Sequence, residues 1–428
     1  MQPFAGLRRT ACLAAISVFV PFVAGAADWP GYRGPEGTGR TPEKIHVPWP
    51  ATGPRVVWKV PSKGGFSSFA VVGNRAYCLE LRDVSGAEQE VLVARDATSG
   101  TELWAKPLGT VKIHDGGDDG TPSNKGGDGP RSSPAADGSR VYAFSSRLVL
   151  SAFDASSGNE VWKHDILKEF EGRNISWQNA QSPVLEGGKI LVSGGGAGQS
   201  LLAFDAATGN VVWKGFDETS THATAVVGTI AGQRQAVFFL KSGLLSVNPK
   251  TGAELWRYSF PFRTSTAASP VISGDIVYCS AGYGVGAGAV RVSKTGAAWT
   301  ATEIYRKAGN VPLANHWSTP VLNAGHLYGM FQFKEYGTGP VKCVEIATGS
   351  VKWEKAGFGP GQVIGSGPSV LALTDAGELV VFAASPKAYE ELARAKVLDG
   401  KCWTTPVIAG NRVYARSTKE AVCVELPR

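Results

Sequence analysis

The sequence predicts an all-β fold, an eight-bladed β-propeller built of four-stranded antiparallel blades. Three observations lead to this prediction. The chain has 54 Gly and 25 Pro in 428 residues, a composition typical of short strands joined by many turns. A ten-residue hairpin motif that ends in Trp occurs five times. A second signal, an apolar strand after a Ser/Thr-Pro-like start, occurs eight times at a spacing of about 40 to 50 residues, which is typical of propeller blades.

The hairpin motif joins two strands through a Gly turn. In each copy Gly stands four residues before Trp, and in four of the five copies the strand before the turn closes with Asp or Asn. An Asp or Asn side chain can hydrogen-bond backbone N–H groups two residues on, and Gly accepts the positive φ that a tight turn needs. The Trp then offers a large apolar surface to a neighbouring element. The copies are RDATSGTELW (95–104), FDASSGNEVW (153–162), FDAATGNVVW (204–213), VNPKTGAELW (247–256) and VEIATGSVKW (344–353).

The eight strand starts divide the chain into eight units. In the fifth unit Tyr305 takes the Trp position, and in the seventh Leu392 or Ala393 does. The eighth unit ends at AVCVEL (421–426) without a fourth strand, whereas RVVWKV (55–60) is a lone strand that contains Trp58. We expect these two segments to pair and close the ring, which removes its open edge. Seven blades is the alternative. The starts are at Ser67, Ser132, Gln181, Ala223, Ala268, Ser318, Ser366 and Thr404.

The first 26 residues predict a secretory signal peptide. Arg8 and Arg9 precede an apolar run (11–23), and Ala24-Gly25-Ala26 offers a small-residue cleavage site. Export by the general secretory route and export by the twin-arginine route both stay open. The apolar run is too short for a membrane span, and we find no later stretch that supplies one. We therefore expect a periplasmic or secreted protein with an N-terminal extension (27–54) and a propeller (55–428).

The charge of the chain bears on the class of partner. Removing Arg8 and Arg9 lowers Lys plus Arg from 43 to 41 against 36 acidic residues, and the remaining basic residues are scattered. This pattern gives nucleic-acid binding little support, and we expect a monomer.

Five widely spaced cysteines remain after cleavage, most of them within apolar strands, so we expect small buried side chains; a bridge from Cys423 to Cys78 or Cys402 is the alternative.

The repeats carry a family resemblance. Their [FLV]D-x-x-[ST]G-x-x-x-W units and S/T-P-V strand starts resemble the pyrroloquinoline-quinone-like (PQQ-like) propeller repeat, which quinoprotein alcohol dehydrogenases share with the outer-membrane assembly factor BamB. DWPGYRGPEGTG (28–39) is similar to the W-P-x-[WY]-R-G-P-x-x-x-G opening of many exported bacterial proteins with this propeller. The resemblance runs from about Asp28 to the C-terminus. It implies a propeller and leaves several functions open, because one fold hosts many functions.

The resemblance implies either a cofactor enzyme or a cofactor-free binder. The dehydrogenases have an adjacent Cys-Cys pair against the quinone and a Ca²⁺ site, and no two cysteines are adjacent here. We therefore expect a non-catalytic binding or scaffold module without a cofactor or metal, with a protein partner or a carbohydrate-like ligand. The alternatives are a PQQ-dependent dehydrogenase with Ca²⁺ that oxidises an alcohol or sugar, and a hydrolase or lyase on the propeller face.

Candidate ligand-binding residues lie in the loops that lead into the innermost strands, where propellers usually bind ligands. Aromatic rings beside amides and an Arg suit a sugar, a peptide or an anionic ligand. Asn174 and Arg263 belong to the same loops, and the polar segment 115–130 lies just before one of the inner strands. The candidates are Arg131, Trp177, Gln178, Asn179, His222, Asn315, His316, Trp317, Gln362 and Trp403.

Overall fold

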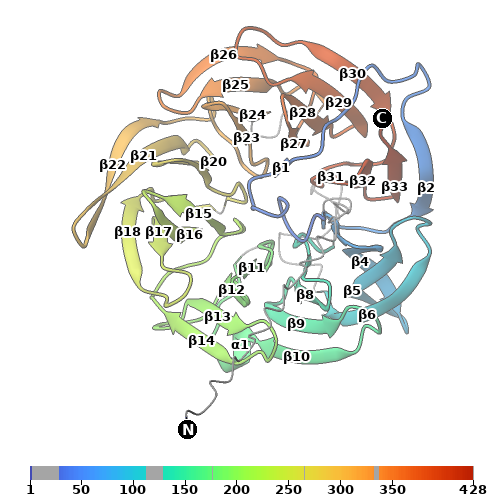
Figure 1. Ribbon diagram of the computed structural model, residues 1–428. Coiled ribbons are helices and arrows are strands. Elements are labelled where there is room, and N and C mark those ends of the chain that lie inside the picture. The colour runs from blue at the N-terminus through green and yellow to red at the C-terminus, as the bar shows by residue number, and fades with distance from the viewer. Residues whose placement is uncertain (2–27, 112–128, 176, 265, 332–336, 428) are drawn as a thin grey trace.

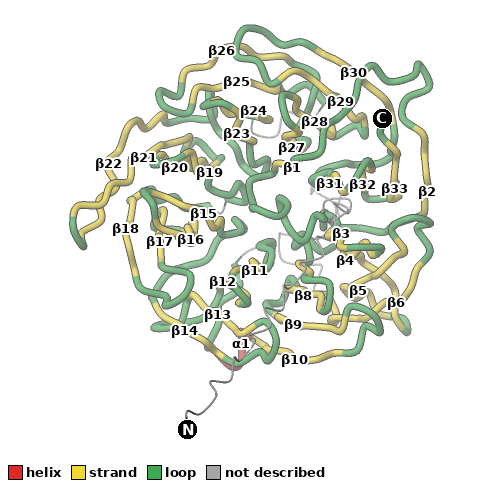
Figure 2. The backbone as a smooth tube through the Cα atoms, viewed as in Figure 1, coloured by secondary structure: helices red, strands yellow, loops and turns green. Residues whose placement is uncertain are grey.

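The computed structural model describes Met1 and residues 28–111, 129–175, 177–264, 266–331 and 337–427. The predicted eight-bladed propeller is confirmed: eight sheets surround one axis, each with four antiparallel strands, and Figure 1 views the ring along this axis. Figure 2 shows that strands and loops make up nearly all of the ring. The short helix α1 (Ile166–Glu169) follows the second blade. Within the described ranges, no helix is long and apolar enough to span a membrane.

The blades follow one another in chain order, each with its strands running from the axis to the perimeter. Blade 1 has β3 (Ala70–Val72), β4 (Arg75–Val84), β5 (Ala87–Asp96) and β6 (Glu102–Thr110). Blade 2 has β7 (Ala135–Ala136), β8 (Arg140–Phe144), β9 (Val149–Asp154) and β10 (Glu160–Asp165). Blade 3 has β11 (Val184–Glu186), β12 (Lys189–Ser193), β13 (Leu201–Asp205) and β14 (Val211–Gly215). Blade 4 has β15 (Val226–Ile230), β16 (Gln233–Leu240), β17 (Gly243–Val247) and β18 (Glu254–Ser259).

The second half of the ring repeats this order. Blade 5 has β19 (Val271–Ser273), β20 (Ile276–Ala281), β21 (Gly286–Thr295) and β22 (Ala298–Lys307). Blade 6 has β23 (Val321–Asn323), β24 (His326–Met330), β25 (Val341–Glu345) and β26 (Ser350–Lys355). Blade 7 has β27 (Gln362–Ser366), β28 (Ser369–Leu373), β29 (Glu378–Ala383) and β30 (Glu391–Lys396). Blade 8 has β31 (Val407–Ala409), β32 (Arg412–Arg416) and β33 (Glu420–Glu425), with β2 (Arg55–Pro61) as its outer strand.

The ring closes as predicted. Strand β2 pairs antiparallel with β33, and Trp58 lies opposite Cys423. In the other blades Trp104, Trp162, Trp213, Trp256 and Trp353 hold this same place on the outer strand. Tyr305 holds it in blade 5, opposite Ala289, and Ala393 holds it in blade 7, opposite Val381. The prediction for Tyr305 is confirmed, and of the two residues predicted for blade 7 it is Ala393.

Four of these Trp side chains, and Tyr305, lie against the turn Gly of the next blade. The ring of Trp162 in blade 2 lies against Gly209 in the hairpin turn of blade 3, and a Cβ added to Gly209 would meet the Trp162 ring at 2.8 Å. The Trp162 indole N–H also donates to the Ala206 carbonyl at 3.1 Å. The same pairing of ring and Gly recurs as Trp58 with Gly100, Trp104 with Gly158, Trp213 with Gly252 and Tyr305 with Gly349. The turn and the Trp of one motif therefore serve two different interfaces.

One predicted strand start is wrong. The inner strand of blade 7 was expected to begin at Ser366, but Ser366 is the last residue of β27 and the strand begins at Gln362. The preceding residues are Gly359, Pro360 and Gly361, which lack the Ser/Thr-Pro pattern. The sequence signal therefore selected the next strand, β28, and misplaced the blade by one strand.

The N-terminal segment crosses one end of the axis, where Figure 1 shows it in blue running over the middle of the ring. Trp29 exchanges two backbone hydrogen bonds with Val71 in blade 1 and is 1% exposed. Two blades away, β1 (Arg40–Thr41) pairs parallel with β27 of blade 7. Between them the buried Arg33 donates to the carbonyls of Thr319 and Pro320 in blade 6. The DWPGYRGPEGTG motif thus ties both halves of the ring together.

This segment leaves a cavity of about 210 Å³ at its own end of the axis. The cavity lies between residues 30–37 and the inner strands of blades 2, 3 and 4, and Arg234 and Glu186 lie on its lining. These two side chains form a bidentate ion pair, in which two guanidinium nitrogens of Arg234 donate to the two carboxylate oxygens of Glu186 at 2.9 and 2.8 Å. The lining also includes Thr224, so the cavity reaches the start of the inner strand of blade 4.

Candidate functional site at the channel mouth

A ring of small hydroxyl side chains surrounds the axis just before the inner strands, and the side of this ring away from the N-terminal segment is here called the channel mouth. Seven blades supply one Ser or Thr each just before the inner strand, and blade 7 supplies Gln362. Several of these residues bond to the next blade through a backbone N–H and a hydroxyl, which explains why Ser or Thr precedes each strand. The backbone N–H donates to the hydroxyl at 2.9 Å from Ser68 to Ser133, Ser133 to Ser182, Ser182 to Thr224 and Ser269 to Thr319. In addition, the hydroxyls of Ser68 and Ser269 donate to the carbonyls of Thr405 and Thr224.

A second layer lies two residues before this ring in every blade, and we call it the mouth layer. It is not symmetric. Blades 6, 8 and 1 contribute aromatic rings, blade 7 contributes Pro, blades 2 and 4 contribute Arg and His, and blades 3 and 5 contribute Ala. Four of the predicted ligand-binding residues fall in this layer. Its members are Phe66, Arg131, Ala180, His222, Ala267, Trp317, Pro360 and Trp403.

The aromatic members of the mouth layer stack on one another. Trp403 lies 4.9 Å from Trp317 and 5.2 Å from Phe66 between ring centroids, both at 27°. His316 meets Trp317 edge-on at 4.9 Å and Tyr283 at 4.8 Å. The row therefore crosses from blade 1 through blade 8 to the loops of blades 5 and 6. Stacking of this kind covers a ring face of the middle residue, Trp403, and leaves ring edges for a further contact.

Gln362 lies between the two Trp residues of the row. Its amide nitrogen donates to the Trp317 carbonyl at 3.2 Å and to the Trp403 carbonyl at 3.3 Å. The residue is only 5% exposed, and its amide oxygen meets no partner within the described part of the chain. A buried acceptor that stays unsatisfied costs about 1–3 kcal/mol, so this oxygen marks a place for a donor group.

The predicted amides of the neighbouring loops have structural roles. Asn179 donates to the carbonyls of Ser145 and Gln181, both at 3.2 Å, and is 2% exposed. The fully buried Asn315 donates to the Met330 carbonyl and accepts from the Tyr278 hydroxyl. These contacts satisfy backbone groups where the loops turn. They explain why amides stand at these positions without assigning them to a ligand.

A second group of predicted residues gathers beside blades 2 and 3. The Arg131 guanidinium donates to the Trp177 carbonyl at 2.6 Å, and Asn174 donates to the Gln178 side-chain oxygen at 2.9 Å. Trp177 and Gln178 have φ of 70° and 58°, a left-handed conformation that costs a residue with a side chain about 1–2 kcal/mol. Trp177 is also 37% exposed. A strained loop with an exposed Trp is typical of a functional surface.

The remaining candidates are spread out. His222 belongs to blade 4 of the mouth layer, and the exposed Arg263 lies in the loop before β19. Within the described residues, no three His, Cys, Asp or Glu side chains are grouped to hold a metal ion. The segment 115–130 lies outside the described residues except for Gly129 and Pro130. The Pro130 carbonyl accepts from the Phe66 and Ser67 N–H groups, so it helps to place Phe66.

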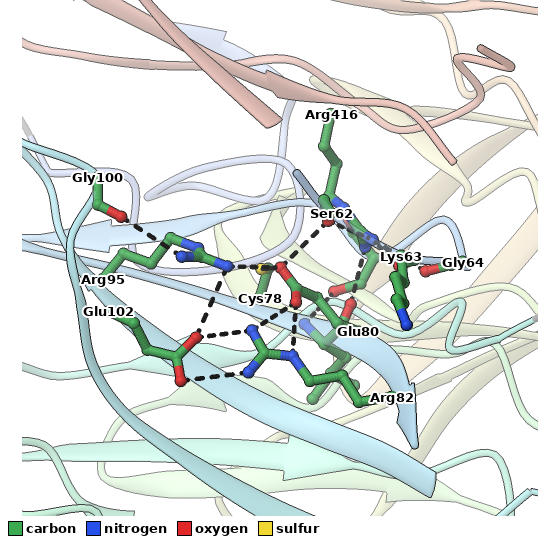
Figure 3. A network of polar contacts seen from close by, with 12 residues as sticks. Ser62, Lys63, Gly64, Cys78, Glu80, Arg82, Arg95, Gly100, Glu102 and Arg416 are labelled. Atoms are coloured by element: carbon green, nitrogen blue, oxygen red, sulfur yellow. Dashed lines mark hydrogen bonds and ion pairs between the residues drawn. The ribbon is translucent and has the colours of Figure 1, made fainter. Parts of the chain in front are cut away.

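A buried charged network holds the loop that carries Phe66. Figure 3 shows Arg416, from the end of β32, reaching from blade 8 to this loop. Its guanidinium donates to the carbonyls of Lys63 and Gly64 at 2.8 and 2.9 Å and to the Ser62 hydroxyl at 3.1 Å. Arg416 is fully buried. The mouth layer is therefore built against the seam where the first and last blades meet.

Glu80 is the centre of this network, as Figure 3 shows. Its carboxylate accepts from Ser62 and Arg95, both at 3.1 Å, and from two nitrogens of Arg82 at 2.9 and 2.7 Å. Burial alone would raise the pKa of the Glu80 carboxyl, but Arg416, Arg82 and Arg95 together outweigh burial and hold this pKa below its ordinary value of 4.5. Glu80 therefore remains charged at neutral pH and compensates the buried guanidinium groups.

The five cysteines of the described chain are free and buried, as expected for small core side chains. The alternative bridge from Cys423 to Cys78 or Cys402 is therefore wrong. Burial raises the pKa of Cys78, Cys402 and Cys423 to about 12. A thiol with such a pKa is almost fully protonated at neutral pH and reacts slowly.

Sequence reasoning missed Phe66, Lys401 and Arg416. Phe66 stands two residues before Ser68, the same offset that Trp317 and Trp403 have from their own ring residues, so aligning the eight starts would have found it. Lys401 places its ammonium 5.3 Å from the centre of the Trp403 ring, and no repeat position signals this contact. Arg416 looks in the sequence like an ordinary strand end.

Comparisons with known proteins agree with the fold and with the repeat. The chain is 26% identical over 243 residues to the outer membrane protein assembly factor BamB of Shewanella oneidensis, a match that covers 53% of this chain and only 56% of that relative. Among solved structures, BamB of Moraxella catarrhalis superposes with a TM-score of 0.55 at 14% identity, covering 86% of this chain and 98% of that one.

A quinohemoprotein alcohol dehydrogenase from Comamonas testosteroni superposes with a TM-score of 0.62 at 13% identity, covering 93% of this chain and 80% of that one. At these identities the superpositions show the fold alone, and they do not separate binders from enzymes. A sequence model of one family, described as outer membrane protein assembly factor BamB, matches residues 87–329, more than half of the chain. The chain therefore belongs to this BamB-like family of PQQ-repeat propellers.

Proposed function

We propose that the protein is an exported, non-catalytic binding module that holds a protein segment or a carbohydrate-like ligand at the channel mouth. The observation that carries this proposal is the asymmetric mouth layer. Its stacked rings of Phe66, Trp403 and Trp317 offer apolar contact area, and Gln362 adds an acceptor with no described partner. Convergent aromatic and polar groups at a propeller mouth are what a binding site needs.

Two further points support export and a scaffold role. The leader 1–26 has the composition of a secretory signal, and the matched relatives carry the name of an outer-membrane assembly factor. We propose periplasmic location for the mature chain on these grounds. We also propose that it acts through contacts with other proteins, as the relatives' name implies for them.

The described residues at the mouth fit pyrroloquinoline quinone poorly. A quinone needs an open ring face or an adjacent Cys pair to stack on, but Trp403, the middle ring of the row, already has Trp317, Phe66 and the Lys401 ammonium against it, and no two of the buried cysteines are adjacent in the sequence. The mouth layer itself contains no carboxylate that would serve a Ca²⁺ ion beside the quinone. We derive no reaction step through this cofactor.

The purified mature protein, incubated with pyrroloquinoline quinone and CaCl₂, tests this proposal. We expect no dye reduction with a panel of alcohols and sugars, and no rise in melting temperature with the quinone. Alanine substitution of Arg131, His222 and His316 tests the hydrolase or lyase alternative on a panel of chromogenic esters and glycosides. Turnover that depends on the quinone, or turnover that collapses in these three variants while they stay folded, would show that the protein is an enzyme.

A further inference from the structure

We infer that the ligand of the channel mouth is an extended peptide segment, one that inserts an aromatic or large aliphatic side chain next to an acidic residue. This inference rests on the proposed binding function and narrows its ligand to one class. It depends on how the aromatic rings are used, on what the neighbouring amides already bind, and on the charges beside the mouth layer.

The aromatic row is built for contact with its ring edges. A sugar stacks on an aromatic side chain through a ring face, but Trp403 is stacked against both Trp317 and Phe66 at 27°. His316 further covers Trp317 from the side. A row of stacked rings instead forms an apolar wall, which suits the side chain of an aromatic or aliphatic residue packed edge-to-face against it.

The amides that would read the hydroxyl pattern of a sugar are already occupied. The amide nitrogens of Asn179 and Asn315 bond to backbone carbonyls, and that of Asn174 bonds to the Ser146 carbonyl and to Gln178. Sugar recognition needs several donors and acceptors aimed at adjacent hydroxyls. A peptide backbone needs fewer, because one N–H to one acceptor is enough to fix its register beside an anchor side chain.

Gln362 supplies that acceptor. It is 95% buried, its nitrogen is held by the carbonyls of Trp317 and Trp403, and its oxygen has no partner among the described residues. The two bonds fix the amide plane between the two Trp residues. A peptide N–H that bonds to this oxygen would place the following side chain against the aromatic row, and the bond would satisfy the buried oxygen.

The charges beside the mouth layer are complementary to a carboxylate. Arg131 is a member of the layer, Lys401 lies over the Trp403 ring, and the exposed Lys63 precedes Phe66 by three residues. The described carboxylates around this end of the ring already have partners: Glu80 lies within its arginine network, Glu90 accepts from the Ser146 N–H, and Asp375 accepts from the Gly337 N–H. An acidic residue next to the anchor would therefore meet positively charged side chains of the mouth layer and of the residues beside it.

Selection from a random heptapeptide library displayed on phage, against the mature protein, tests the inference. We expect selected sequences to share an aromatic or large aliphatic residue with Asp or Glu within three positions. A synthetic copy of one such peptide should bind at least tenfold more weakly to Trp403→Ala and to Gln362→Leu, and its affinity should fall as salt rises. Trp299→Ala, which removes a Trp on the hairpin of β21 and β22 that packs on Lys294, is the matched control and should bind as the unaltered protein does.

The same variants on an array of immobilised glycans distinguish failure of the inference from failure of the proposed function. Glycan binding that Trp403→Ala abolishes, without any selected peptide, would overturn the peptide inference and leave a binding module. Selected peptides without an apolar anchor, or peptides whose affinity is equal in all variants, would also overturn it. If neither peptide nor glycan binds the folded protein, both the inference and the proposed mouth-binding function are wrong. Circular dichroism of each variant confirms that it is folded.

Discussion

The contact between a Trp and a Gly in the next blade makes a sharp prediction about what holds the ring together. Gly209 has a φ of 76°, and a Cβ added there would lie 2.8 Å from the Trp162 ring. Gly232, in the inner turn of blade 4, has a φ of 79° and nothing within 4 Å of the same added atom. The two glycines therefore share the backbone strain of an Ala substitution, and only Gly209 adds a clash with the neighbouring blade.

The magnitudes follow from these two terms. Placing Ala in a left-handed conformation costs about 1–2 kcal/mol, and we expect Gly232→Ala to lower the free energy of unfolding by this amount. Forcing an extra carbon into packed surroundings costs a further 1–3 kcal/mol or so, which makes Gly209→Ala about 2–5 kcal/mol destabilising. Trp162→Ala should cost about 3–5 kcal/mol, because the side chain is 9% exposed and its N–H bonds to Ala206.

Combining the substitutions isolates the contact. In the Trp162→Ala background the clash is gone, so Gly209→Ala should cost only the backbone strain of about 1–2 kcal/mol, and the two effects should be non-additive. Urea unfolding followed by tryptophan fluorescence and by circular dichroism measures all four proteins, and coincident transitions justify the two-state treatment. Equal destabilisation by Gly209→Ala and Gly232→Ala, or additive effects in the double variant, would refute the account of the blade lock.

Three more predictions follow from buried polar groups and thiols. Arg33→Met should lower the free energy of unfolding by about 3 kcal/mol or more, because the carbonyls of Thr319 and Pro320 lose a charged donor; an unchanged urea midpoint would contradict the role of the N-terminal segment. Glu80→Gln should cost about 3–5 kcal/mol at pH 7, because it leaves buried guanidinium groups uncompensated, whereas Glu160→Gln at an exposed Lys163 pair should stay within about 0.5 kcal/mol. The pKa of Glu80 in the folded protein lies below its ordinary value of 4.5, so the contribution of Glu80 to the free energy of unfolding is fully present above pH 4.5 and is lost as the pH falls further. Below pH 4.5 the free energy of unfolding of Glu80→Gln should therefore depend less on pH than that of the unaltered protein. In native protein at pH 8, iodoacetamide should label none of the five cysteines, and in urea it should label all five; a mass spectrum showing rapid native labelling, or a disulfide, would oppose the buried thiols.

The fold was open to prediction because the repeat encodes interfaces that every blade needs. The Gly turn and the Trp of one hairpin contact two different blades: in blade 3, Gly209 lies against Trp162 of blade 2, and Trp213 lies against Gly252 of blade 4. The prediction for Trp58 succeeded for the same reason: it completes blade 8 and lies against Gly100 of blade 1. Blade 7 was misplaced because Gln362 stands where the other blades have Ser or Thr. The signal failed at the blade where the hydroxyl ring itself is interrupted.

The site was harder to predict, because residue type alone does not separate a ligand contact from a loop support. Asn179 and Asn315 have the chemistry of a sugar site, and the structure uses both to satisfy backbone carbonyls. Trp317 and Trp403 could not be joined by sequence, since 86 residues and the whole of blade 7 separate two rings that lie 4.9 Å apart in the structure. What does separate the two roles is position. Phe66, Arg131, His222, Trp317 and Trp403 share one offset from the hydroxyl ring, and at that offset the repeat imposes no residue type. A position that the fold leaves free and the chain fills with aromatic and charged residues is where binding can be selected without loss of the propeller.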